Sequence, residues 1–193
     1  MGYSNYFTFQ PGSTQYADVW PAIVISTRTI LDAMPSLGVE VCGPDGLGEP
    51  IVHPASGIEF NGNAAQRAAY ADSLTPMAID ALVIPPPHQV APDVPPDCRV
   101  FRHVKTLALP YDLAVAAVLL RAHQLAGGIF IIGSDGEWDE DWIQPAGANP
   151  RDLLRQLFHT TINRDPLVDV TQGMAIGDTG WIDPRLVDNP RIP

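Results

Sequence analysis

The stretch RVFRHVKTLALPYDLAVAAVLLRAHQLAGGIFII, residues 99–132, changes its hydrophobic period twice. Residues 99–106 alternate between two faces, as a β-strand does. Residues 113–125 are apolar nearly all round and end at Gly127-Gly128, which predicts a deeply buried helix. Residues 129–132 are apolar without alternation, which is typical of a central strand covered on both faces. The stretch therefore predicts a βαβ-like unit whose two strands need not be neighbours in their sheet.

Shorter patterns on both sides of this unit predict further elements. Residues 22–34 favour a helix capped by Asp18 and stopped by Pro35, although their many β-branched residues leave a strand as the alternative. Alternation and turn signals predict strands at 3–9, 39–42, 51–53, 58–62 and 81–84, and composition and capping predict helices at 64–72 and 150–158. We expect an α+β protein, α/β-like in its βαβ unit, with one mixed sheet and helices packed on it.

Proline content marks the expected boundaries. Six prolines fall between residues 85 and 96, and such a run forms an extended surface segment because proline donates no backbone hydrogen bond. The pieces on either side are too poor in strands to stand alone, so residues 1–161 are expected to form a single domain. Residues 162–193 hold four prolines and three glycines without a sustained period, and predict a long irregular tail that packs on the domain or on a neighbouring subunit.

Charge and hydropathy narrow the class of protein. The formal charge of −11 opposes binding to phosphate backbones, so we expect no nucleic-acid partner. Apolar stretches fall short of the roughly 20 residues that span a bilayer, and the first residues lack the pattern of a signal peptide, so we expect no membrane partner. A cytoplasmic protein with reduced thiols follows, although the spacing of Cys42 and Cys98 does not decide whether they pair.

An acidic loop follows the expected central strand. Asp135, Glu137, Asp139 and Asp141 alternate along it, as the oxygen ligands of a calcium loop do. Glu140 stands where such a loop needs glycine, and Ala146 stands where it needs a bidentate glutamate. The loop is therefore expected to be a solvated turn whose two tryptophans cover the core edge, with a Ca²⁺ or Mg²⁺ site as the alternative and no other cofactor.

Polar side chains around the βαβ unit form a second candidate site. His103 and Lys105 lie two residues apart on one strand and face the same way, which suits an anion-binding or acid–base pair. Lys105 is the only lysine in the chain, and a lysine loses its proton more readily than an arginine when it is desolvated. Tyr111, Asp112 and Asp135 complete the candidate catalytic set. The competing interpretation is an exposed edge lysine and a half-buried histidine.

Three short motifs resemble those of small uncharacterised bacterial and phage-type proteins. They are Phe60-Asn61-Gly62, the segment from Lys105-Thr106 to Pro110-Tyr111-Asp112, and Ser134-Asp135-Gly136. The resemblance covers about residues 3–158 and implies no activity. It implies only that Lys105, Tyr111, Asp112 and Asp135 share a site.

Common catalytic signatures are missing from the sequence. There is no nucleophile elbow, phosphate-binding loop or dinucleotide fingerprint, and the five histidines have no metal-ligand spacing. The first hypothesis is therefore a non-enzymatic accessory or protein-interaction protein that self-associates through its tail or an edge strand. The second is an enzyme or binder of small ligands or metals that uses the candidate set above, and the third is an acidic mimic of nucleic acid.

Overall fold

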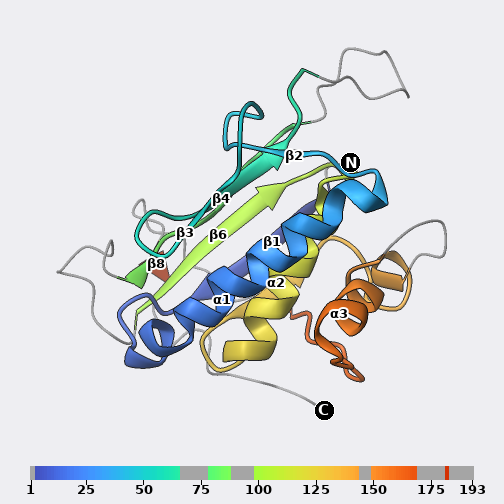
Figure 1. The fold of residues 1–193 in the computed structure, drawn as a ribbon. Coiled ribbons are helices and arrows are strands. Elements are labelled where there is room, and N and C mark those ends of the chain that lie inside the picture. The colour runs from blue at the N-terminus through green and yellow to red at the C-terminus, as the bar shows by residue number, and fades with distance from the viewer. Residues whose placement is uncertain (1–2, 66–77, 88–97, 144–148, 169–180, 183–193) are drawn as a thin grey trace.

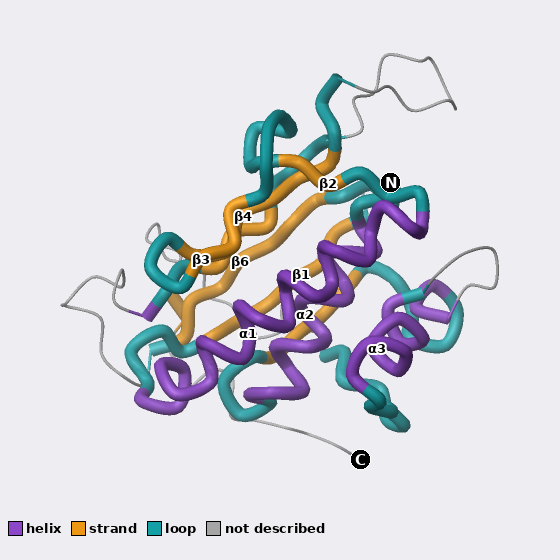
Figure 2. Tube along the Cα trace, viewed as in Figure 1, coloured by secondary structure: helices purple, strands orange, loops and turns teal. Residues whose placement is uncertain are grey.

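Two antiparallel β-sheets and three α-helices make up the part of the chain that the computed structural model describes, residues 3–65, 78–87, 98–143, 149–168 and 181–182 (Figures 1 and 2). The α+β class is confirmed. The expected single mixed sheet is wrong, because the strands divide between two sheets in which every pair of strands is antiparallel. No helix in the described ranges is long and apolar enough to cross a membrane.

The first sheet has the order β7-β1-β6-β8, with β1 at Ser4–Phe9, β6 at Arg99–Lys105, β7 at Ile131–Ser134 and β8 at Trp181–Ile182. The prediction of a central strand at 129–132 is wrong, since β1 lies between β6 and β7. β7 is nevertheless well covered: its inner residue Ile132 is fully buried, and the Ile132 carbonyl accepts a hydrogen bond from Val168 N–H. The apolar run therefore predicted a buried strand correctly, but it did not indicate the position of that strand in the sheet.

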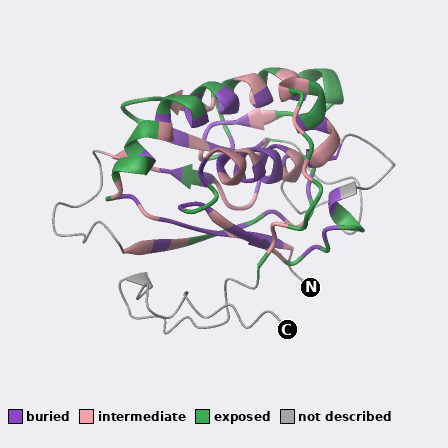
Figure 3. Ribbon diagram, turned by 90° about the horizontal axis from the view of Figure 1, so that it is seen from below, coloured by how far each residue is buried: buried purple, intermediate pink, exposed green. Residues whose placement is uncertain are grey.

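Helix α2, Asp112–Ala126, connects β6 to β7. Both strands are antiparallel to β1, so they run parallel to each other with β1 between them, as the predicted unit allowed. Their carboxyl ends therefore meet at one edge of the sheet, beside the amino end of β1. Figure 3 shows α2 buried along most of its length between the sheet and α1.

Helix α1 is longer than its sequence pattern predicts. It spans Thr14–Ala33, which confirms a helix over 22–34 and removes the strand alternative. The predicted cap at Asp18 is wrong: the Ser13 side chain accepts the hydrogen bond from Tyr16 N–H, and Pro21 lies inside the helix. The short 3-10 helix η1, Met34–Leu37, then ends at Gly38, whose φ of 72° is left-handed.

The second sheet is built around β4, Gly57–Gly62. It pairs with β2 at Val41–Cys42, β3 at Ile51–His53 and β5 at Leu82–Ile84. All four strands fall where the sequence predicts them, within a few residues. Most of the predicted helix at 64–72 and of the proline-rich segment at 85–96 lies outside the described residues.

The core lies between the helices and both sheets, and β4 and β5 of the second sheet contribute fully buried side chains to it. Phe7 and Phe9 of β1 contact Phe130 with ring centroids 6.2 and 5.6 Å away, and Tyr16 of α1 joins the same cluster. Each of these rings is fully buried and contributes roughly 2–3 kcal/mol of transfer free energy. The last helix, α3 at Pro150–Phe158, begins after the predicted cap Asn149, which accepts a hydrogen bond from Asp152 N–H.

The tail divides into described and undescribed parts. Residues 159–168 contain no helix or extended strand, as the sequence predicts. Later in the chain, Trp181 and Ile182 form β8, in which Trp181 pairs with Val100 of β6 and Ile182 pairs with Arg99. This pairing places that part of the tail against the protein's own sheet.

Candidate functional site

A cavity of about 410 Å³ opens at the edge where β6 and β7 end. Its polar wall comes from four separate segments: the residue before β1, the start of α2, the 3-10 helix η3 at Asp141–Ile143, and the cap of α3. These segments contribute Tyr3, Asp112, Asp141 with Trp142, and Asn149. The apolar wall includes Leu37, Val39, Leu113 and Ala116. The cavity thus lies beyond the carboxyl ends of two parallel strands, where ligand sites of such units are usually found.

Asp112 is the most perturbed acid of this cavity. Its Oδ1 accepts a hydrogen bond from Asn5 Nδ2 at 2.7 Å and another from Thr106 Oγ1 at 2.5 Å. Burial raises the pKa of Asp112 to about 6, against the two hydrogen bonds, which lower it, and with a smaller contribution from the charge of Asp141, which raises it. Asp112 can therefore exchange a proton close to neutral pH.

Tyr3 and Trp142 supply the aromatic part of the wall. Burial, and next the charge of Asp112, raise the pKa of Tyr3 to about 12, so its phenol stays protonated at neutral pH. Trp142 is 2% exposed, and its Nε1–H has no hydrogen-bond partner in the described structure. The Oδ1 atom of Asn5, whose amide holds Asp112, is also buried without a partner there. Buried polar atoms in proteins are usually paired, so these two need an explanation.

The Ser134-Asp135-Gly136 motif holds β1 in place. Asp135 accepts hydrogen bonds from Ser4 N–H at 2.9 Å and from the Tyr6 hydroxyl at 2.7 Å. Gly136 leaves room for Tyr3, because a Cβ at that position would lie 2.8 Å from Cε2 of the ring. The motif is thus explained by packing and by backbone hydrogen bonds.

The motif from Lys105-Thr106 to Pro110-Tyr111-Asp112 forms the loop between β6 and α2. Tyr3 O accepts hydrogen bonds from Thr106 N–H and Leu107 N–H, both at 3.0 Å. The Tyr111 hydroxyl lies within 3.4 Å of three backbone groups, and burial raises the pKa of this phenol. Two consecutive non-glycine residues, Leu107 and Ala108, have φ of 54°, a conformation that costs energy and needs the surrounding hydrogen bonds to persist.

The five predicted site residues do not meet at one place. Asp112 lines the cavity on the helix side of β1, and Tyr111 is buried in the core. Side chains alternate along a strand, so Ser4 and Tyr6 lie on the opposite face from Asn5. His103, Lys105 and Asp135 lie with Ser4 and Tyr6 on that outer face, through the strand register and the hydrogen bonds of Asp135.

On the outer face, Lys105 and Asp135 flank Ser4 from β6 and from the end of β7, strands roughly 10 Å apart because β1 lies between them. His103 stacks on Phe101 with ring centroids 6.3 Å apart, and Phe101 stacks on Tyr6 in turn. His103 and Lys105 thus share a face, as their spacing predicts, and Asp112 is separated from them by the sheet.

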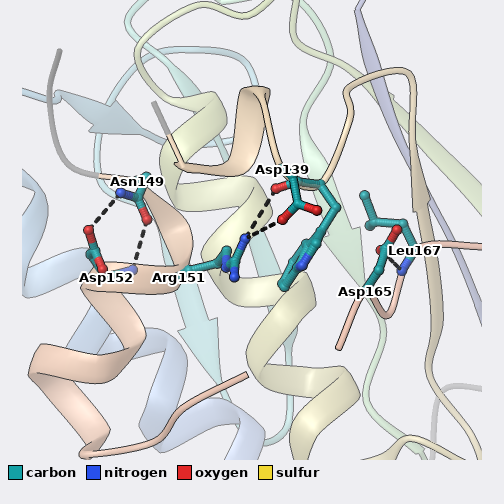
Figure 4. Close-up of polar contacts among 7 residues, drawn as sticks. Asp139, Asn149, Arg151, Asp152, Asp165 and Leu167 are labelled. Carbon is teal, nitrogen blue, oxygen red and sulfur yellow. Dashed lines mark hydrogen bonds and ion pairs between the residues drawn. The ribbon is translucent and has the colours of Figure 1, made fainter. Parts of the chain in front are cut away.

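The four carboxylates predicted as metal ligands do not converge. Asp139 pairs with Arg151 at 3.3 Å (Figure 4), and Asp141 Oδ2 accepts a hydrogen bond from Glu137 N–H at 2.8 Å. Asp135 instead accepts hydrogen bonds from Ser4 and Tyr6 of β1. Within the described ranges, no three acidic, cysteine or histidine side chains are grouped to hold a metal ion. The loop leads into η3, and Trp138 and Trp142 pack against each other with ring centroids 5.7 Å apart.

Sequence reasoning missed most of the cavity. It identified Asp112, and it treated Asn149 as a cap and Trp142 as core cover, but it gave no role to Tyr3, Asn5 or Thr106. One signal was available: Asn5 is a polar residue on the face of β1 that carries Phe7 and Phe9, and it is fully buried. A polar side chain on a core face needs a partner, and here the partner is Asp112.

Comparisons with known proteins give no relative. No protein-family model matches the chain, and no curated protein or solved structure is significantly similar to it. The function must therefore be argued from the cavity itself.

Proposed function

We propose that this protein binds a small polar molecule in the cavity at the ends of β6 and β7, with Asp112 as its proton-exchanging group. The observation that carries the proposal is the convergence of Tyr3, Asp112, Asp141 and Trp142 on one space of about 410 Å³. The four residues come from three distant parts of the sequence. The volume is that of a pocket for a small organic molecule, since such pockets hold roughly 300–1,000 Å³.

The arrangement around Asp112 supports acid–base chemistry. Its two hydrogen bonds within the described structure both end on Oδ1, and Oδ2 has no partner there. A carboxyl whose pKa lies near neutrality transfers protons most effectively at physiological pH. Asn5 and Thr106 fix the orientation of the carboxyl, and fixed orientation is what a catalytic or ligand-binding group needs.

A ligand-observed NMR screen at pH 7.5 tests this function. The panel contains small amines, polyols, carboxylates and nucleosides, and the expected result is saturation transfer to at least one class. The signal should be lost in Asp112→Asn and kept in Asp18→Asn, which alters an exposed carboxylate of α1 outside the cavity wall. Absence of transfer to every class, or equal transfer in Asp112→Asn, would refute the proposal.

Self-association is a second candidate function, carried by the pairing of β8 with β6. A short strand that reaches a sheet edge from a long tail can pair equally with the sheet of a second copy, as in domain swapping. Light scattering on the full chain and on a variant without residues 162–193 tests this hypothesis. A dimer that becomes a monomer supports it, and an identical monomer in both cases contradicts it. The acidic mimic and the cytoplasmic location stay predictions from sequence.

A further inference from the structure

We propose that the ligand of the cavity is an organic cation, a small molecule that carries a protonated amine. This inference rests on the proposed function and adds the chemical class of the ligand. Two features of the cavity wall carry it, namely its charge and its aromatic rings.

Both charged side chains among the described residues of the wall are acidic. Asp112 and Asp141 line the cavity, and no lysine, arginine or histidine of the described ranges does. The arginines of the adjacent α3 are engaged elsewhere: Arg151 lies over the Trp138 ring, 4.2 Å from its centroid, and pairs with Asp139, and Arg155 pairs with Asp152 at 2.7 Å. Two carboxylates without a neutralising side chain attract a cation and repel an anion, and the attraction is strongest for the half-buried Asp112.

The aromatic rings of the wall suit an ammonium group rather than a metal ion. Tyr3 and Trp142 line the same space as the two carboxylates. The face of a tyrosine or tryptophan ring attracts an organic cation, and tryptophan does so most strongly. A divalent metal would need further oxygen ligands, and the described residues hold no group of three acidic side chains.

Three matched probes separate these features. Phenylethanolamine, phenylethylene glycol and mandelate share a phenyl ring and a hydroxyl group, and differ in carrying an ammonium, a second hydroxyl or a carboxylate. Each is titrated into the full ¹⁵N-labelled chain at pH 7.5 and low salt. The readout is the indole N–H peak of Trp142, assigned by its loss in Trp142→Phe.

We expect phenylethanolamine to shift this peak and to bind at least about tenfold more tightly than the glycol, with no binding of mandelate. Asp112→Asn and Asp141→Asn should each weaken the amine about tenfold, because each removes a charge-assisted contact. Asp139→Asn, two residues from Asp141 but outside the cavity wall, should change nothing. Asp141 is exposed, so its variant remains informative if Asp112→Asn fails to fold.

Equal binding of the amine and the glycol would overturn the cationic ligand and leave the proposed function standing. Amine binding that neither asparagine variant weakens would place the ligand elsewhere and also overturn it. If none of the three probes moves the Trp142 peak, the inference fails. The proposed function then fails only if the broader screen is negative as well.

Discussion

Asp112 and Asp135 hold the same end of β1 from opposite faces of the sheet, yet their surroundings differ. Asp112 accepts its hydrogen bonds from Asn5 and Thr106 inside the cavity, whereas Asp135 accepts from Ser4 and Tyr6 on the exposed outer face. Each acid has a tryptophan nearby, since Trp142 lines the cavity with Asp112, and Trp138 lines a second pocket together with Asp135 and Tyr6. The residue type is the same and each acid has a tryptophan near it, so the depth of burial makes one acid a structural tie and gives the other a pKa of about 6.

The largest effect is expected at Gly136, where the Ser134-Asp135-Gly136 motif packs against Tyr3 of the cavity wall. Gly136→Ala places a Cβ 2.8 Å from Cε2 of Tyr3 and should lower the free energy of unfolding by about 1–3 kcal/mol. Gly128→Ala is the control, because nothing lies within 4 Å of a Cβ there. Urea unfolding measures both variants. Equal losses of stability in the two variants would show that the packing of Tyr3 does not require glycine at position 136.

Removing one hydroxyl on each face tests the comparison directly. Thr106→Val deletes the donor to the half-buried Asp112 and should cost about 2 kcal/mol of unfolding free energy. Tyr6→Phe deletes the matching donor to the exposed Asp135 and should cost about 0.5 kcal/mol, because water replaces the lost bond. The comparison breaks if chemical denaturation gives Tyr6→Phe the larger cost.

The pH dependence of stability should carry the signature of Asp112. Its pKa in the folded protein is raised from 3.8 to about 6, so the folded state binds the extra proton between these values, and stability falls as the pH rises through 6. Between pH 5 and 7.5 the wild type should lose roughly 1 kcal/mol relative to Asp112→Asn. A difference between the two proteins that is independent of pH would contradict the raised pKa. Thr106→Val should move the window upward, since the Thr106 bond lowers this pKa.

The smallest effect is expected on the outer loop. Asp139 is 84% exposed and pairs with Arg151, and exposed ion pairs of this kind contribute roughly 0–1 kcal/mol. Asp139→Asn should therefore change the thermal midpoint by no more than about 2 °C. A larger loss, measured by differential scanning calorimetry, would mean that the loop depends on this pair more than the buried Trp138 and Trp142 imply.

Local signals in the sequence predicted the helices and most strand positions. α3 begins at its predicted cap because Asn149 and Pro150 act within one turn of the chain. α1 began earlier than predicted because Ser13, and not Asp18, caps it, and a helix tolerates Pro21 when buried residues such as Trp20 and Ile23 hold it on both sides. Capping and periodicity are local, and local rules can be applied without a structure.

Strand order and the cavity depend on contacts between distant residues, which no local pattern encodes. No feature of residues 4–9 indicates that this strand lies between the strands at 99–105 and 131–134. Asp112 could be singled out because it starts a helix beside a motif. Tyr3 and Trp142 could not be joined to it, because only the pairing of β1 with both strands brings them to one cavity.

The position of β1 also has a consequence for how the chain is made. β1 is synthesised well before both of its neighbours, since Ser4 pairs with Lys105 and Asn5 with Ser134. Until residue 134 has been synthesised, the apolar face that carries Phe7 and Phe9 has no completed sheet to join. Such non-local pairing slows folding and leaves aggregation-prone apolar surface exposed during synthesis.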